Sequence, residues 1–231
     1  MQNNRNLFHQ LCLIAFLCTS IMGRSQTVLT IDGGYLVQNS NSTIRLNNTQ
    51  FINNGTFQAT ENSNVLITGD GTDEQSAIGG SSVTTFHKVE IRKSSNGVQL
   101  QQDINIDQEL VFEEGNLNLN GNTITLVSDA YFEIESEESR LVGPNGGLVQ
   151  ITVDLNAPNY SPGNIGLRIT SSQNLGTTLI QRVHVPVSLN GTESIERVYK
   201  IFPTNNSDLD ATLKLDYFEA ELNRHSESEL G

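Results

Sequence analysis

The sequence has no tryptophan, and its two cysteines and two methionines all lie in the first 25 residues. The rest of the chain therefore has no disulfide and no cysteine nucleophile. It also lacks a Gly-x-Ser-x-Gly elbow, any pair of His or Cys at zinc spacing, and any helical stripe of apolar residues. These absences remove the common sequence signatures of hydrolases and zinc enzymes, and they predict a protein that is not an enzyme.

The first 25 residues have the pattern of a cleaved signal peptide. Arg5 supplies the positive charge, and residues 11–22 form an apolar run that is too short to cross a bilayer as a helix. Small residues at 23 and 25 predict cleavage between Ser25 and Gln26. The mature chain would then have no transmembrane segment, and it would be secreted or displayed on the extracellular surface of the cell.

Two other interpretations of this segment are less well supported. A buried first helix would need a helical layer to pack against, and the rest of the chain predicts none. A lipid anchor on Cys18 would need a small residue before it, whereas Leu17 is bulky.

Positive charge is scarce after the leader. The leader holds two of the 13 basic residues and none of the 26 acidic ones, so the mature chain has a formal charge of −15. Nucleic acids and anionic lipid surfaces attract Lys and Arg, so this balance argues against both as partners. It permits divalent cations, although solubility alone also explains it.

The sequence is instead a succession of short β-strands. Segments rich in β-branched and aromatic residues, most of them alternating in polarity, are separated by Gly, Asn, Asp and Ser turns. In the first half of the mature chain these segments are 28–31, 43–46, 49–52, 64–68, 89–92, 104–106, 109–112, 116–119, 123–127 and 131–135. The pattern predicts an all-β protein.

The stretch NLNLNGN at residues 116–122 indicates how the strands are arranged. Alternation places its leucines on one face and its amides on the other. Strands of this kind, with short uneven turns, favour a parallel β-helix or solenoid over a barrel for residues 26–147. Leu and Ile would fill the lumen, and Asn would lie outside or at corners, where amides of successive coils stack. At ~20–25 residues per coil, we expect about five or six coils.

The pattern changes at GPNGG, residues 143–147. Four prolines follow, and the expected strands lengthen to 147–155, 165–170, 177–187, 194–203 and 211–218. This predicts an antiparallel β-sandwich over residues 148–231. The sequence after residue 218 is polar and adds no closing strand, so we expect an incomplete sandwich in a piece of a longer protein.

Four segments carry a resemblance to a known family: FINNGTFQATENSNVLITGDG, IGGSSVTTFHKVEIRKSSNGVQL, INIDQELVFEEGNLNLNGNTITLVS and IERVYKIFPTNNSDLDATLKLDYFEAELN. Together they resemble the repetitive surface proteins that gliding Gram-negative bacteria export by the type IX secretion system. The resemblance implies a stalk-like β region followed by sandwich modules at the cell outer membrane, with no defined catalytic site. It also implies a C-terminal sorting domain, which no segment up to Gly231 matches.

Few residues are candidates for a metal site or for acid–base chemistry. In the turn GDGTDE, Asp70, Asp73 and Glu74 are calcium candidates, because calcium prefers carboxylate and carbonyl oxygens on glycine-rich turns. The motif occurs once, so a solvated turn is the alternative. His87 and His184 lie in strand-like sequence, and we expect structural roles for both.

Two further features concern the outer surface. Glu133, Glu135 and Glu137 recur at period two, which predicts a charged outer strand face, with cation binding or acid–base chemistry as the alternative. Tyr160, in the loop APNYSPGN, is the best candidate for an exposed aromatic that contacts carbohydrate, although a packed loop anchor is the simpler interpretation.

Two functions fit this sequence. The first is a non-enzymatic structural or adhesin-like protein, a stalk or matrix module that meets surface polysaccharide or other cell-surface proteins. The alternative is a polysaccharide-binding or polysaccharide-degrading β-helix, which needs charged side chains gathered in one groove. Charges scattered over the coils favour the first function, and a tight mixed-charge groove favours the second.

Overall fold

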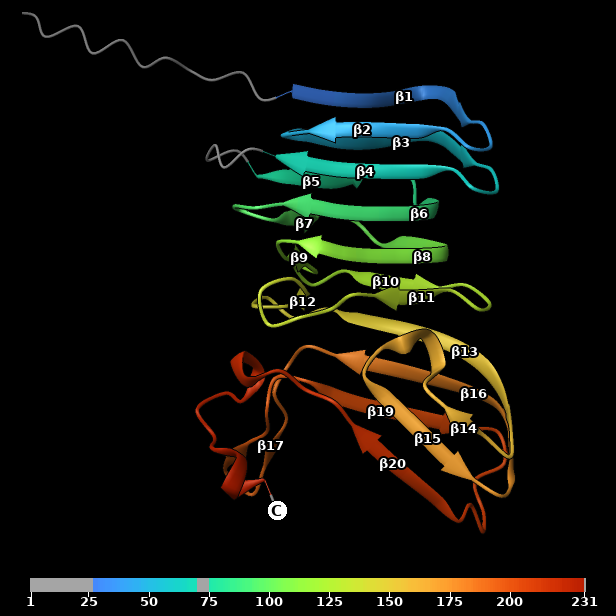
Figure 1. Cartoon of the computed structure of the whole chain (residues 1–231), viewed down its shortest axis with the longest axis vertical. Coiled ribbons are helices and arrows are strands. Elements are labelled where there is room, and N and C mark those ends of the chain that lie inside the picture. Colours follow the sequence, from blue (N-terminus) through green and yellow to red (C-terminus); the bar gives the residue numbers. More distant parts are fainter. Residues whose placement is uncertain (1–26, 70–74, 231) are drawn as a thin grey trace, which may run out of the picture.

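A computed structural model describes residues 27–69 and 75–230. Residues 27–151 form a β-solenoid of about 5 turns made of parallel sheets, and the coils are stacked one above the other in Figure 1. The predicted fold, an all-β chain with an N-terminal solenoid, is confirmed. The predicted signal peptide and its cut between Ser25 and Gln26 lie outside the described residues.

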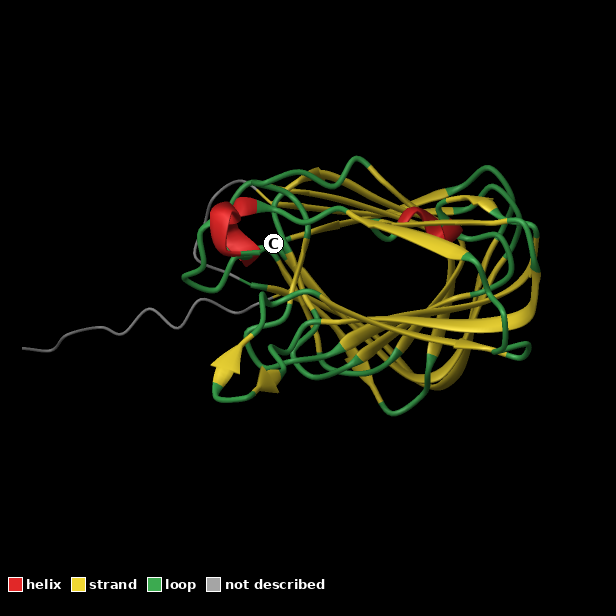
Figure 2. Cartoon of the chain, turned by 90° about the horizontal axis from the view of Figure 1, so that it is seen from below, coloured by secondary structure: helices red, strands yellow, loops and turns green. Residues whose placement is uncertain are grey.

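Two long sheets form the walls of the solenoid, and viewed along its axis their strands enclose an elongated ring (Figure 2). Sheet A contains, in order, β1 (Thr27–Gln38), β3 (Thr49–Ala59), β5 (Ser76–Gly80), β7 (Val98–Leu100), β9 (Leu117–Asn118) and β12 (Leu141–Val142). Sheet B begins with β2 (Thr43–Asn47), β4 (Asn64–Gly69), β6 (Thr84–Lys93), β8 (Ile104–Glu114) and β10 (Thr123–Leu126), and β11 (Tyr131–Glu133) also pairs with β8. All of these strands pair in parallel.

Some solenoid strands are longer than the sequence predicts because they continue around a corner. In β8, residues 104–106 pair with β10, whereas residues 109–111 pair with β11. The sequence predicted two strands here, separated at residues 107 and 108. At that break the pairing of β8 with β6 shifts register, within a single strand of 11 residues.

The lumen is filled by the side chains that the alternation predicts. Leu117 and Leu119 are fully buried. Higher in the stack, the rings of Phe51, Phe57 and Phe86 contact one another with centroids 5.4–5.6 Å apart. Full burial of side chains of this size stabilises the fold by about 1.5–3 kcal/mol each, so the lumen is the main source of the solenoid's stability.

Asparagine residues form corners of the solenoid. Asn62, Asn96 and Asn120 have φ values of 59°, 55° and 49°, a left-handed conformation that Asn tolerates better than most residues. The Nδ2 of Asn120 donates to the carbonyl of Leu100 at 3.1 Å, and its Oδ1 accepts from Asn145 Nδ2 at 2.9 Å. These partners lie about one coil before and one coil after Asn120, so the predicted amide ladder is present at this corner.

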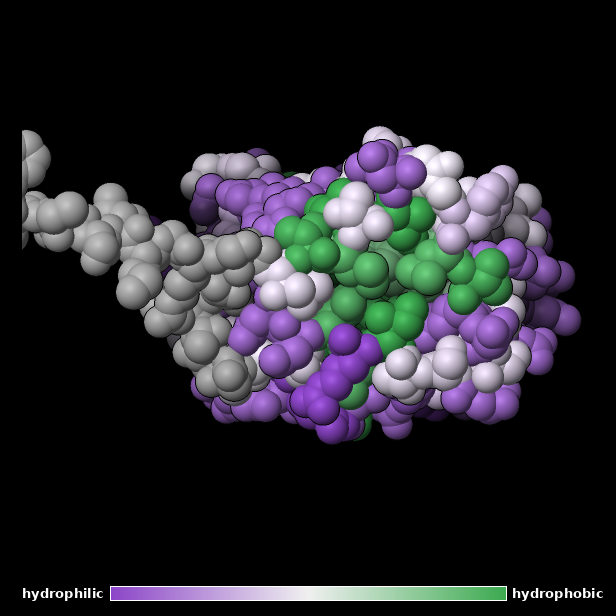
Figure 3. Space-filling model, turned by 90° about the horizontal axis from the view of Figure 1, so that it is seen from above, coloured by the Kyte–Doolittle hydropathy of each residue, from purple (hydrophilic) through white to green (hydrophobic). Residues whose placement is uncertain are grey.

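The first coil has no coil above it within the described residues, because sheets A and B begin with β1 and β2. Its lumen residues Leu29 and Ile44 are only half-buried, and Val28, Tyr35 and Val37 are exposed. Figure 3 shows apolar side chains gathered on this end of the solenoid.

The C-terminal region is a small sandwich that continues sheet B. β13 (Leu148–Asn156) pairs in parallel with β10 and antiparallel with β16 (Asn174–Val183), which pairs in turn with β19 (Val198–Pro203). The opposite layer contains β14 (Asn159–Tyr160), β15 (Leu167–Ser171) and β20 (Ala211–Leu215). The remaining elements are β17 (Ser188–Leu189), β18 (Thr192–Glu193) and the 3-10 turns η1 (Pro162–Asn164), η2 (Glu219–Glu221) and η3 (Glu227–Glu229). The predicted domain division at residue 147 stays a prediction, although sheet B crosses it without a break.

The polar end of the chain packs against the rest of the protein. No strand follows β20 in the described part of the chain. Glu221 is nevertheless buried, and its carboxylate lies 2.7 Å from the guanidinium of Arg197. The ring of Phe218 contacts the guanidinium groups of both Arg197 and Arg140, at 4.9 and 5.6 Å from the ring centroid. These contacts anchor the end of the chain on the junction between solenoid and sandwich.

Candidate functional site

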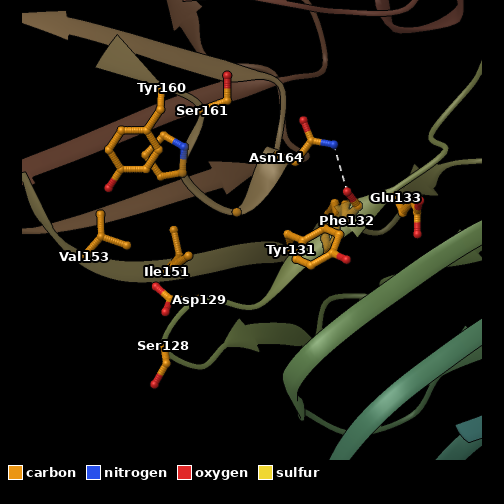
Figure 4. A pocket seen from close by; sticks show the side chains of 12 residues that line it. Ser128, Asp129, Tyr131, Phe132, Glu133, Ile151, Val153, Tyr160, Ser161 and Asn164 are labelled. Atoms are coloured by element: carbon orange, nitrogen blue, oxygen red, sulfur yellow. Dashed lines mark hydrogen bonds between the residues drawn. The ribbon is translucent and has the colours of Figure 1, made fainter. Parts of the chain in front are cut away.

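A cleft of about 560 Å³ lies where the last coil of the solenoid meets the sandwich. β11 and the turn before it line one side, β14 and η1 line the other, and Ile151 and Val153 of β13 lie between them (Figure 4). The Nδ2 of Asn164 in η1 donates to the carbonyl of Phe132 in β11 at 2.8 Å. This hydrogen bond ties the two sides of the cleft together.

Two exposed tyrosines flank the apolar centre of the cleft. In the view of Figure 4, Tyr160 and Tyr131 lie on either side of Ile151. Their exposed fractions are 44% and 38%. Asp129 and Glu133 also line the cleft. Aromatic rings with a polar tip, next to carboxylates that accept hydrogen bonds, suit a ligand with apolar faces and many hydroxyl groups.

Both tyrosines lie in negatively charged surroundings. Burial, followed by the charges of Asp129 and Asp154, raises the pKa of Tyr160. The pKa of Tyr131 is raised by its hydrogen bond to Glu109, whose Oε1 lies 3.1 Å from the hydroxyl, and by the charge of that carboxylate. Both phenols therefore keep their protons at neutral pH.

A charged surface adjoins the cleft on the outer side of β6, β8 and β11. We call it the mixed-charge face, and it consists of Lys88, Glu90, Arg92, Glu109, Glu113 and Glu133. The strand register aligns Lys88 with Glu109 and Glu109 with Tyr131, which are 21 and 22 residues apart. This row of three residues crosses three strands and ends at the cleft, because its last residue, Tyr131, also lines the cleft.

The basic groups of the mixed-charge face are paired with carboxylates. Lys88 Nζ lies 2.6 Å from Glu109 Oε2. Arg92 contacts both Glu90 and Glu113 at 2.5 Å. Pairs of this partly exposed kind contribute about 0–1 kcal/mol each, so they shape the surface more than they stabilise the fold.

Glu109 and Glu133 have pKa values that are pushed apart. Burial raises the pKa of Glu109, but hydrogen bonds with Glu133 and Lys88 and the charge of Lys88 outweigh it, so its pKa is lowered overall. The hydrogen bond and the charge of Glu109 raise the pKa of Glu133. Two neighbouring carboxyls with separated pKa values can serve as acid and base, provided that a substrate reaches both.

Both signs of charge thus meet on one face of the solenoid, although other charged residues, such as Asp103 and Arg140, lie outside it. That distribution resembles the arrangement expected for a polysaccharide-binding or polysaccharide-degrading protein. The charges lie on a sheet surface beside the cleft, however, and not inside a groove. Three other basic residues of the region do not belong to the mixed-charge face: Arg45 donates to Thr68 at 3.3 Å, the buried Lys93 donates to Asn48 at 2.6 Å, and the guanidinium of Arg140 lies over the ring of Phe218.

The expectation of three glutamates on one outer strand face is wrong. β11 ends at Glu133, and Ile134 has a φ of 63°, which turns the chain. Glu135 is therefore directed inward, where it pairs with the buried Arg182. Glu137 accepts hydrogen bonds from the backbone amides of residues 219 and 220.

The other candidate site residues are the predicted calcium ligands and two histidines. Asp70, Asp73 and Glu74 lie outside the described residues, so the calcium site stays a prediction. Within residues 27–69 and 75–230, no three His, Cys, Asp or Glu side chains are grouped to hold a metal. His87 contacts Asp107 at 2.7 Å, and His184 is buried.

The sequence did not single out Tyr131, Asp129 or the row that begins at Lys88. The only signal was the spacing of 21 and 22 residues between Lys88, Glu109 and Tyr131. Coil lengths in this chain are uneven, so that spacing acquires meaning only when the register is known.

No family model matches the chain, and neither a curated protein nor a solved structure does. Among the described residues, no helix has the length and apolar character needed to cross a membrane.

Proposed function

We propose that this protein is an exported, non-enzymatic, adhesin-like module of the cell surface or its matrix, and that its cleft binds a surface polysaccharide. The observation that carries the proposal is the pair of exposed tyrosines, Tyr131 and Tyr160, on either side of an apolar strand with carboxylates beside them. The resemblance to type IX-exported surface proteins and the predicted signal peptide support export. The stacked coils support a stalk-like role, because they space the cleft from the other end of the molecule.

The cleft has features that suit a sugar chain rather than a compact cofactor. It opens on a junction between two regions, where a ligand longer than the cleft can continue along the mixed-charge face. Stacking on exposed aromatic rings is typically worth about 0.5–1.5 kcal/mol per ring. Two rings therefore suit weak binding that gains strength when many copies are displayed together.

A glycan panel tests this proposal. We expect the mature chain, residues 26–231, to bind at least one polysaccharide, and Tyr131→Ala/Tyr160→Ala to weaken that binding about tenfold or more, from the loss of two stacking contacts. Tyr35→Ala is the matched control, because Tyr35 is the most exposed tyrosine and lies on the first coil. Equal binding by all three proteins, or no binding to any glycan, would refute the proposal.

A second candidate function, polysaccharide degradation, is favoured by one observation: the carboxyls of Glu133, which lines the cleft, and Glu109 on the paired strand are neighbours whose pKa values are shifted in opposite directions. If the pair is catalytic, the same panel should yield shorter products over time. Glu133→Gln should then abolish turnover while glycan binding persists. Stable, uncleaved polysaccharide in the presence of the wild-type protein argues for the non-enzymatic function.

A further inference from the structure

The open edge of β20 is the feature that carries this inference, which is independent of the proposed glycan binding. β20 is the outer strand of the sheet β14-β15-β20, and β15 is the strand it pairs with in the described part of the chain. Figure 1 shows β20 along the lower margin of the molecule. All five of its residues are exposed, including Leu213 at 48% and Leu215 at 51%. A free strand edge with apolar side chains recruits another strand.

The exposure of the leucines has a structural cause. Leu213 faces a cavity of about 290 Å³ between β20 and the other layer of the sandwich, which Ile169 and Ile201 also line. The two layers do not close over this side of β20. An apolar surface is therefore left beside the open edge.

Backbone alternation shows which residues of β20 point to the open edge. Asp216 N–H donates to the carbonyl of Gly166 at 2.8 Å, on the β15 side. Successive residues of an antiparallel strand direct their backbone groups to opposite edges, so Lys214 shares the direction of Asp216. Leu213 and Leu215 therefore direct their N–H and C=O groups to the open edge.

The side chains alternate in the same way. Lys214 and Asp216 lie on one face, with Nζ and Oδ1 3.1 Å apart, and their side chains are 72% and 60% exposed. Leu213 and Leu215 lie on the other face. The edge thus presents one positive charge and one negative charge two residues apart.

We propose that the open edge at the end of β20 and the two residues after it is a homodimer interface, in which residues 213–217 of two copies pair antiparallel about a twofold axis at Leu215. In this register Lys214 lies opposite Asp216 of the second copy, and Asp216 opposite its Lys214. The two Leu215 side chains meet at the axis. The interface is isologous, as a twofold dimer requires.

Charge selects this register among those the backbone allows. An axis at Lys214 places two lysines opposite each other, and an axis at Asp216 places two aspartates opposite each other, which opposes pairing. An axis at Leu213 places Lys214 opposite Thr212 and forms no ion pair. With the axis at Leu215, both charges of each copy are matched and the charges form an alternating ring of four.

The partner at this edge is a second copy of the chain, because Lys214 and Asp216 of one copy complement Asp216 and Lys214 of the other. The mature chain has a formal charge of −15, so two copies repel each other over most of their surfaces. Residues 211–216 carry one charge of each sign and no net charge. A dimer formed there would also present two clefts on one particle, which raises avidity for any repetitive ligand.

Charge reversal and rescue test the proposal. Sedimentation velocity on the mature chain should show a dimer at micromolar concentration. Lys214→Asp and Asp216→Lys should each raise the dissociation constant about tenfold or more, because each sets like charges opposite one another. The double variant Lys214→Asp/Asp216→Lys should return the dissociation constant to near its wild-type value. Lys200→Asp is the charge-matched control on β19, and it should leave the dimer intact.

A second variant tests the edge itself. Leu215→Pro removes a donor that points to the open edge and leaves the bonds to β15 in place, so the variant should be monomeric, with a circular dichroism spectrum like that of the wild type. If the wild-type protein is still a monomer at about 100 µM, the proposal is overturned. A dimer that survives both single charge reversals, or a double variant that stays monomeric, overturns it too.

Discussion

Arg182 and Glu135 form a doubly hydrogen-bonded ion pair between the sandwich and the last coil of the solenoid. Nη1 lies 2.6 Å from Oε2, and Nη2 lies 2.9 Å from Oε1. The side chain of Arg182 is fully buried. It also lies 3.8 Å from Glu221, so one buried guanidinium joins the solenoid, the sandwich and the end of the chain.

Arg182→Met should lower the free energy of unfolding by about 3–5 kcal/mol, because it leaves the carboxylate of Glu135 buried without this partner. Urea unfolding followed by circular dichroism measures the change. Arg168→Met is the control, since Arg168 is an exposed arginine of β15 whose loss should cost less than about 1 kcal/mol. Equal losses in the two variants would show that the buried pair has no special role.

His184 should make the protein less stable below pH 6.5. Its pKa is lowered well below 6.5 by burial and then by the charges of Arg182, Arg197 and Arg140. As the pH falls, the unfolded chain therefore takes up a proton at this histidine before the folded chain does. The contribution of His184 to the free energy of unfolding is complete above pH 6.5 and declines as the pH falls further.

The expected decline at His184 is about 1.4 kcal/mol per pH unit below 6.5, until the folded form also binds the proton. Urea unfolding at pH 7.5 and pH 5.5 should therefore show a smaller difference for His184→Gln than for the wild type. His225→Asn is the comparison, and a similar reduction in both variants would count against His184.

Substitutions at Asn120 should separate the amide ladder from the backbone conformation. Asn120→Gly keeps a residue that tolerates the φ of 49° but removes the bonds to Leu100 and Asn145, at a cost of about 1–2 kcal/mol. Asn120→Ala should cost roughly 1 kcal/mol more, because alanine is strained in the left-handed region. Thermal and urea unfolding of both variants measure the difference. If the alanine variant is the more stable of the two, the assigned role of the positive φ is wrong.

The acidic side chains of the cleft should select against polyuronates. Asp129→Asn/Glu133→Gln removes two negative charges from its lining. Binding of a polyuronate should then strengthen roughly three- to tenfold at low salt, whereas binding of a neutral glycan should change little. Isothermal titration at low and high salt makes the comparison. A polyuronate that binds the wild type more tightly than the variant would contradict the expected repulsion.

Local sequence determined the class of fold. Alternating Leu and Asn at residues 116–122 sets one face of a strand against the other, and Asn or Gly at corners permits the left-handed turns that a coil needs. Both effects act within a few residues, so the sequence predicts them without the structure. The longer strands after residue 147 likewise predicted an antiparallel region, because strand length and turn residues are also local features of the sequence.

Only the tertiary structure decided which residues share a surface. Lys88, Glu109 and Tyr131 form one row because the chain between them makes two coils of 21 and 22 residues, and one residue more in either coil would change the register. Glu135 is directed inward because the chain turns at Ile134, and the buried Arg182 that receives it lies 47 residues later in the sequence. The cleft exists because sheet B continues through β13 into the sandwich, which places Tyr160 across from Tyr131. These relationships depend on contacts between distant segments, and local alternation and turn chemistry do not encode them.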